Sequence, residues 1–310
     1  LVLCIMTFIP GLQYERNGAR RWIKMPFFTF QPSELLKFII VIFLANYFDK
    51  YLRKDDFDEE KNVGPAVVIL VLFVSIVFAQ KDFSTGLFVL FIGLLMFYIA
   101  KVKMLWIIPF CILAVPAIIL MILTEQYRVN RIAAFLNPDE YVQSFNFQSI
   151  ASKKAVITGG FWGQGIGDGL EKLNNIPEVQ SDYIFAGWTE AMGFIGVIFY
   201  FVLLIFFVSR AIIIALKCPD RFSAFGTFGC TAVIFFQSLM NVSVVCGIVP
   251  TTGIPLPFFS NGGSSVIVTL CMCGFIINAS RVDGDSFVKE GGSARNLNDD
   301  FEIVSESIFS

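Results

Sequence analysis

Apolar residues along this chain fall into long, uninterrupted blocks with short polar stretches between them. The full blocks cover 33–49, 64–79, 83–100, 105–123, 183–209, 223–249 and about 256–279. Half a block, LVLCIMTFIPG, opens the chain. Crossing the hydrocarbon core takes about 20 apolar residues in a helix, whose backbone satisfies its own hydrogen bonds. The pattern therefore predicts an all-α polytopic membrane protein with seven full spans and the end of an eighth.

Three polar stretches interrupt this pattern. A basic segment covers 12–31, a long stretch rich in Asn, Gln, Gly and Lys covers 124–182, and an acidic tail with Ser and Gly covers 282–310. We expect one membrane-embedded domain over 1–281, with a large outer loop at about 124–182. The tail has the composition of a disordered cytoplasmic segment.

Lys and Arg in the short loops indicate which side of the membrane is cytoplasmic. Loops 50–62, 101–104 and 210–222 carry them on one side, which is therefore cytoplasmic. The opposite side is nevertheless basic, since it carries Arg20 and Arg21 in segment 12–31. Arginine forks suit an anionic group such as phosphate on the outer face. Pairing with nearby acidic residues or lipid head groups is the alternative.

Composition limits both the expected partners and the side chains available for acid–base catalysis. Hydrophobic residues make up 56% of the chain, the net charge is −2, and histidine is absent. The overall charge gives no reason to expect a nucleic-acid partner. Asp182 stands where the outer loop runs into an apolar block, so it is the candidate for acid–base work there. Its alternative role is the N-cap of the helix that begins near Tyr183.

Three long motifs resemble the SEDS family (shape, elongation, division and sporulation), which includes FtsW, RodA and SpoVE. They are NGARRWIKMPFFTFQPSELLK at 17–37, SKKAVITGGFWGQGIGDGLEKLNNIPEVQSDYIFAGWTEAMGFIG at 152–196 and GIVPTTGIPLPFFSNGGSS at 247–265. The resemblance covers almost all of 12–281. NGARRWI and INASR look more like FtsW than RodA.

The resemblance implies a SEDS-type bundle, in which members have ten helices and a large extracytoplasmic loop. This chain would then start inside the third helix. The implied enzyme is a peptidoglycan glycosyltransferase that polymerises lipid II, a disaccharide-pentapeptide on undecaprenyl pyrophosphate, by inverting transfer with release of undecaprenyl pyrophosphate, in division or elongation. It is a multi-pass protein of the bacterial plasma (inner) membrane, with its active site on the extracytoplasmic face.

The resemblance also implies partners. These are lipid II, a class B penicillin-binding protein transpeptidase and other divisome or elongasome membrane proteins. A lipid II flippase and a non-catalytic divisome scaffold are the alternative functions. A flippase needs charged residues distributed through the bilayer, whereas the basic and candidate catalytic residues here gather on one side, which favours the enzyme.

Residue roles follow from the family motifs. Asp182 matches the essential aspartate, which implies a general base for the acceptor hydroxyl. No cofactor is required by the sequence, although a divalent cation (Mg or Mn) at the pyrophosphate fits the chemistry. Asn174 replaces an acidic residue common in FtsW-type members, so no metal ligand set is assigned. The implied substrate-binding residues are Arg20, Arg21, Trp22, Glu34, Lys37, Lys153, Lys154, Glu178, Ser260, Asn261, Ser264 and Ser265.

Structural alternatives accompany several of these residues. Arg21 and Trp22 also suit an interfacial anchor. Glu34 and Lys37 lie one helical turn apart and can pair inside the membrane as a brace of the cavity. The Pro- and Gly-rich stretch around Ser260 also suits a re-entrant structural turn.

Overall fold

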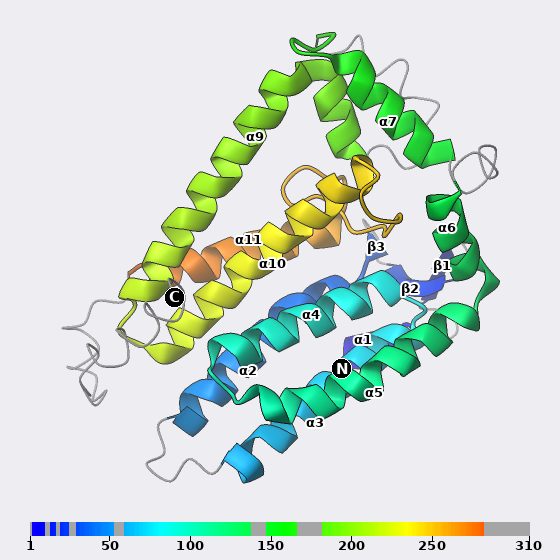
Figure 1. Cartoon of the computed structure of the whole chain (residues 1–310). Coiled ribbons are helices and arrows are strands. Elements are labelled where there is room, and N and C mark those ends of the chain that lie inside the picture. The colour runs from blue at the N-terminus through cyan, green and yellow to red at the C-terminus, as the bar shows by residue number, and fades with distance from the viewer. Residues whose placement is uncertain are drawn as a thin grey trace.

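The computed structural model describes residues 2–9, 13–16, 19–24, 29–52, 59–137, 147–165 and 182–281. They form a helical bundle with a small sheet at one end (Figure 1). The outer loop between 166 and 181, with Glu178, and the tail 282–310 lie outside the described residues. The helices are α1 (Val2–Met6), α2 (Pro32–Leu52), α3 (Glu59–Ala79), α4 (Phe83–Ile99), α5 (Met104–Leu123), α6 (Gln126–Leu136), α7 (Phe147–Gly159), α9 (Ile184–Lys217), α10 (Arg221–Val245) and α11 (Gly263–Ala279).

The predicted helices are confirmed. Each apolar block that the sequence predicts to span the membrane contains a long helix, and α1 corresponds to the half-block. By length and composition alone, α9 and α10 are long and apolar enough to cross a membrane, and shorter apolar helices accompany them. The last helix begins later than predicted, at Gly263, because residues 251–262 form a turn-rich segment instead.

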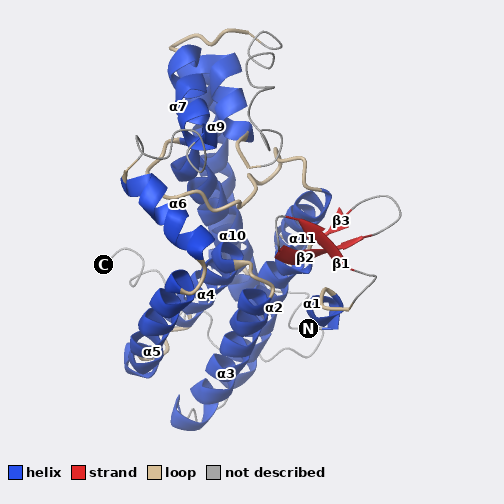
Figure 2. Cartoon of the chain, turned by 90° about the vertical axis from the view of Figure 1, so that its right-hand side faces the viewer, coloured by secondary structure: helices blue, strands red, loops and turns tan. Residues whose placement is uncertain are grey.

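The basic segment 12–31 differs from the expected polar connection. It forms an antiparallel sheet of β1 (Gln13–Arg16), β2 (Ala19–Lys24) and β3 (Thr29–Phe30) in the order β1-β2-β3. Figure 2 shows this sheet beside α2 and α11. Ile23 of β2 is buried, so the sheet is packed onto the bundle rather than left in solvent. The predicted helical bundle thus carries a small sheet at one end.

The core of the bundle is built around α2. Ile40, Leu44 and Phe48 are buried in one apolar cluster with residues of α3 and α4, and Val41 belongs to a second cluster with α10 and α11. Phe48 meets Phe97 of α4 edge to face at 5.1 Å between ring centroids. Because α2 contacts α3, α4, α10 and α11, it is the central helix of the bundle.

A break at Gly193 divides α9. Gly193 has φ 63° and ψ −163°, a conformation essentially restricted to glycine. The chain after α7 docks into the break, where Phe194 N–H donates to the Gly160 carbonyl (2.9 Å) and Gln164 N–H donates to the Glu190 carbonyl (3.0 Å). Figure 1 shows α9 reversing sharply where α7 lies against it. Because of this reversal, the first residues of α9, and Asp182 before them, lie beside the end of α10.

We expect Gly193→Ala to destabilise the fold. The strained backbone costs about 1–3 kcal/mol, and an added Cβ would lie 2.6 Å from the Phe161 carbonyl oxygen. The unfolding temperature of the purified protein in detergent measures the effect. Gly274→Ala in α11 is the matched control, because nothing lies within 4 Å of its added Cβ. Equal unfolding temperatures for the two variants would show that the break is not required.

Candidate active site

Asp182 lies in a small pocket where the start of α9, the end of α10, α6, α7 and the 251–254 loop meet. The pocket has about 20 Å³ of space for a water-sized group, so it fits a single hydroxyl and not a whole sugar. Asp182 is half-buried at its wall. The lining residues are Arg131, Gln148, Asp182, Tyr183, Asn241, Val244, Thr251, Thr252, Gly253 and Ile254.

The backbone of Asp182 is fixed by a side chain of α10. The Nδ2 of Asn241, which is buried, donates to the Asp182 carbonyl at 2.8 Å and to the Ile254 carbonyl at 2.9 Å. Gly253 has φ +73°, and a Cβ added there would lie 3.4 Å from Asp182 Oδ2. The carboxylate of Asp182 therefore faces Gly253 in the 251–254 loop.

Arg131 of α6 brings a positive charge to the same pocket. Its Nη1 donates to the Thr251 carbonyl at 3.0 Å, and its guanidinium stacks on the Tyr127 ring at 4.6 Å from the centroid. Its Nη2 also donates to the Tyr127 hydroxyl. The arginine is held by loop backbone and by an aromatic ring, so the pocket contains a fixed cation as well as the carboxylate of Asp182.

Tyr183 cannot replace Asp182 as the proton acceptor. A phenol keeps its proton at physiological pH, so Tyr183 has no free base to offer. Asp182 is the only carboxylate among the described residues that line this pocket, and the chain has no histidine. The N-cap position of α9 belongs to Tyr183, one residue after Asp182, which speaks against the capping role as its main one.

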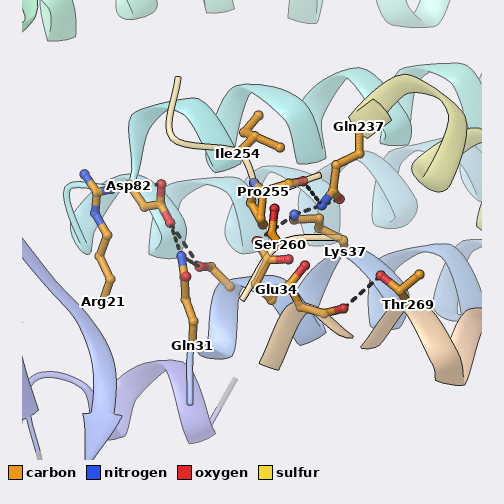
Figure 3. A network of polar contacts seen from close by, with 12 residues as sticks. Arg21, Gln31, Glu34, Lys37, Asp82, Gln237, Ile254, Pro255, Ser260 and Thr269 are labelled. Carbon is orange, nitrogen blue, oxygen red and sulfur yellow. Dashed lines mark hydrogen bonds and ion pairs between the residues drawn. The ribbon is translucent and has the colours of Figure 1, made fainter. Parts of the chain in front are cut away.

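Glu34 and Lys37 meet inside the bundle, as their spacing predicts. Lys37 Nζ lies 2.7 Å from Glu34 Oε1 and donates to Gln237 Oε1 of α10 at 3.0 Å, with both charged side chains buried. Figure 3 shows these three side chains converging. Lys37 also lies over the Phe88 ring, 5.5 Å from its centroid. Neither charged residue lines the Asp182 pocket, so their geometry is that of a brace.

A second polar centre surrounds Asp82, at the turn between α3 and α4. Gln31 Nε2 and Ser33 Oγ donate to Asp82 Oδ2 at 2.9 and 3.0 Å, and Arg21 Nη1 lies 3.5 Å from Asp82 Oδ1 (Figure 3). Arg21 also donates to the Lys81 carbonyl. These contacts tie β2 to the turn. Trp22 is half-buried in the same strand, which also contains Arg20.

The remaining predicted residues lie apart from the Asp182 pocket. Lys153 and Lys154 are exposed on α7, and Asn261 is exposed. Ser260, Ser264 and Ser265 are buried, and Ser260 Oγ accepts from the Leu256 N–H at 2.7 Å. That bond closes the turn before α11.

Sequence reasoning missed several residues of the pocket. Arg131 lies in the polar stretch 124–182, and the sequence assigned no role to it or to Asn241, Gln148 and Thr252. A polar amide inside the apolar block 223–249 was the available signal for Asn241. Within the described part of the chain, no group of three or more His, Cys, Asp or Glu side chains is placed to hold a metal ion.

Known proteins resemble this chain over most of its length. Residues 1–284 match the profile of the FtsW, RodA and SpoVE family, described as "Cell cycle protein". A protein of Geobacter sp. (strain M18) named "Probable peptidoglycan glycosyltransferase FtsW" is 38% identical over 279 residues, which cover 90% of this chain and 76% of the relative.

Two solved structures are also similar. One, described as "Structural coordination of polymerization and crosslinking by a peptidoglycan synthase complex", has a TM-score of 0.71 at 25% identity, covering 90% of this chain and 78% of the other. The Thermus thermophilus Rod shape determining protein RodA has the same fold, with a TM-score of 0.61 at 22% identity over 90% of this chain and 74% of the other.

We expect Lys37→Met to destabilise the bundle strongly, by about 3–5 kcal/mol, because it leaves the buried Glu34 carboxylate without its counter-charge. The double variant Glu34→Gln with Lys37→Met should recover much of this loss, since no buried charge remains. Denaturant unfolding in detergent measures both. A Lys37→Met protein of unchanged stability that has lost turnover would instead indicate a ligand-binding lysine.

Proposed function

The chain belongs to the FtsW, RodA and SpoVE family, and from this premise we propose that it is a peptidoglycan glycosyltransferase that polymerises lipid II at the outer face of the plasma membrane. The observation that carries the proposal is the half-buried Asp182 carboxylate, held beside Arg131 in a pocket with room for one hydroxyl group. The name of the Geobacter relative, whose length this chain largely covers, supports the reaction class.

The placement of the pocket supports an outward-facing site. The α4–α5 connection and the α9–α10 connection carry Lys101, Lys103, Lys217 and Arg221. Figure 1 shows these connections at the end of the bundle opposite to α6 and the sheet. Because short basic loops favour the cytoplasm, the Asp182 pocket faces the other way. A substrate anchored by a lipid tail would present its sugar at that membrane edge.

In the proposed reaction, Asp182 takes the proton from the 4-hydroxyl of the acceptor sugar. The hydroxyl oxygen forms the new bond to the anomeric carbon of the donor, while the bond from that carbon to the pyrophosphate oxygen breaks. The carbon is inverted, and undecaprenyl pyrophosphate leaves with the bonding electron pair. A pyrophosphate leaving group needs little acid assistance, so a single carboxylate suffices, unlike the carboxylate pair of glycoside hydrolysis.

The charge on the pyrophosphate calls for cations. Arg131 is fixed next to the carboxylate, and the exposed Lys153 and Lys154 lie on α7, which packs against α9. We assign Arg20 and Arg21 the same task at the sheet, where the guanidinium of Arg21 is shared with Asp82. Trp22 and the polar residues of the turn before α11 would contact the sugar or lipid. A divalent cation, Mg or Mn, would add charge at the pyrophosphate.

A transpeptidase partner completes the proposal. The similar solved structure is described as a peptidoglycan synthase complex that coordinates polymerization and crosslinking. By this likeness, the chain would work with a class B penicillin-binding protein, which supplies the peptide cross-linking step, and with other membrane proteins of division or elongation.

We expect Asp182→Asn to lower the polymerisation rate by about 10²–10⁴-fold, the usual contribution of a general base. The substitution keeps the size of the side chain and removes its proton-accepting charge. Gel analysis of fluorescent lipid II, incubated with purified protein and its partner, measures the rate.

Asp220→Asn is the matched control. Asp220 caps α10 at the opposite end of the bundle by accepting from Ser223 N–H, and Asn caps equally well. This variant should polymerise at the wild-type rate. A near wild-type rate for folded Asp182→Asn would reject the base, and translocation of lipid II across vesicles without polymerisation would favour the flippase.

A further inference from the structure

We propose that Asn241 is a positioning residue for the Asp182 base and that it works as half of an amide pair on α10, with Gln237 as the other half. The inference rests on the proposed function, since it concerns how the catalytic carboxylate is held. Neither Asn241 nor Gln237 lies within the three motifs at 17–37, 152–196 and 247–265.

The Asn241 side chain joins two segments that are otherwise separate in the chain. Its Nδ2 donates one hydrogen bond to the Asp182 carbonyl and one to the Ile254 carbonyl, so both of its N–H groups are used. The residue is 1% exposed, which keeps water from competing for these bonds. The entry to α9 and the loop before α11 are therefore fixed to one point on α10.

Fixing the backbone of Asp182 also fixes its carboxylate. An aspartate has only two side-chain torsions, and a Cβ added at Gly253, the residue before Ile254, would lie 3.4 Å from Oδ2. Asn241 thus ties the backbone of Asp182 to the loop that its carboxylate faces. A displacement of about 1 Å in a catalytic group costs on the order of 10²-fold in rate, so this geometry matters for turnover.

Gln237 supports the same loop one turn earlier on α10. Its Nε2 donates to the Pro255 carbonyl at 2.9 Å, while its Oε1 accepts from Lys37. Residues at i and i+4 lie on one helix face, so successive turns of α10 hold the successive carbonyls of Ile254 and Pro255. Figure 3 shows Gln237, Pro255 and Lys37 in contact near Ile254. Gln237 thereby links the loop beside Asp182 to the buried Lys37–Glu34 pair.

The variants Asn241→Leu and Asn241→Ser test the inference. Leucine removes both donors at similar volume. Serine is the milder change, because its hydroxyl can donate to the carbonyl four residues back in the helix, as Ser238 does to Ile234. We expect either change to lower kcat for lipid II polymerisation by about tenfold or more, with KM changed less than about twofold. Rates are expressed per folded molecule.

Thr231→Val is the control in the same helix. Thr231 is buried, and its hydroxyl donates within α10 to the Thr227 carbonyl at 2.7 Å. We expect its kcat and KM to equal those of the wild type. If the Asn241 variants keep the wild-type kcat per folded molecule, or if KM rises with kcat unchanged, the positioning role is overturned.

Amide hydrogen exchange of the intact protein in nanodiscs gives a readout that does not depend on activity. Asn241→Ser should raise exchange at 182–186 and 251–256 together, and leave the start of α10 unchanged. Unchanged exchange in both segments would overturn the clamp, which is the pair of hydrogen bonds from Asn241 to the Asp182 and Ile254 carbonyls. Because exchange reports the clamp alone, an active Asp182→Asn protein would reject the proposed base while leaving this result standing, so the two failures are distinguishable.

Discussion

The buried ammonium group of Lys37 is the constraint around which the bundle is organised. A lysine inside an apolar bundle is stable only if its charge is compensated and its N–H donors are used. Glu34 supplies the charge from the same helix, Gln237 supplies an oxygen from α10, and the Phe88 ring covers the ammonium group. The need to satisfy Lys37 therefore fixes how α10 faces α2, and with it the face from which the α10 amides reach the outer loops.

The outer face is assembled on that arrangement by hydrogen bonds to backbone carbonyls. Asn241 holds Asp182 and Ile254, Gln237 holds Pro255, and Arg131 holds Thr251. The break at Gly193 is also needed to place Asp182 beside α10, because a straight α9 would carry its first residues away from α10. The carboxylate that we propose as the base is thus held by helices on several sides, which is the arrangement that precise chemistry requires.

The helices and the Glu34–Lys37 pair could be predicted from sequence because both depend on local spacing. Apolar blocks of sufficient length must be helical in a membrane, and residues three apart in a helix are neighbours. The small sheet was not predicted, since its strands are short, with four, six and two residues. The clamp on Asp182 was not predicted either, because Asn241, Ile254 and Asp182 meet only in the folded chain. Family motifs identified Asp182, whereas Arg131 became a pocket residue only when α6 was placed beside the 251–254 loop.

A structure of the Asp182→Asn protein with its transpeptidase partner and lipid II would test directly whether the sugar reacts at Asp182. We expect the acceptor 4-hydroxyl within hydrogen-bonding distance of the residue 182 side chain, with the pyrophosphate on the side of Arg131. A sugar bound instead at the Arg21–Asp82 centre, with the pocket at residue 182 empty of substrate, would contradict it.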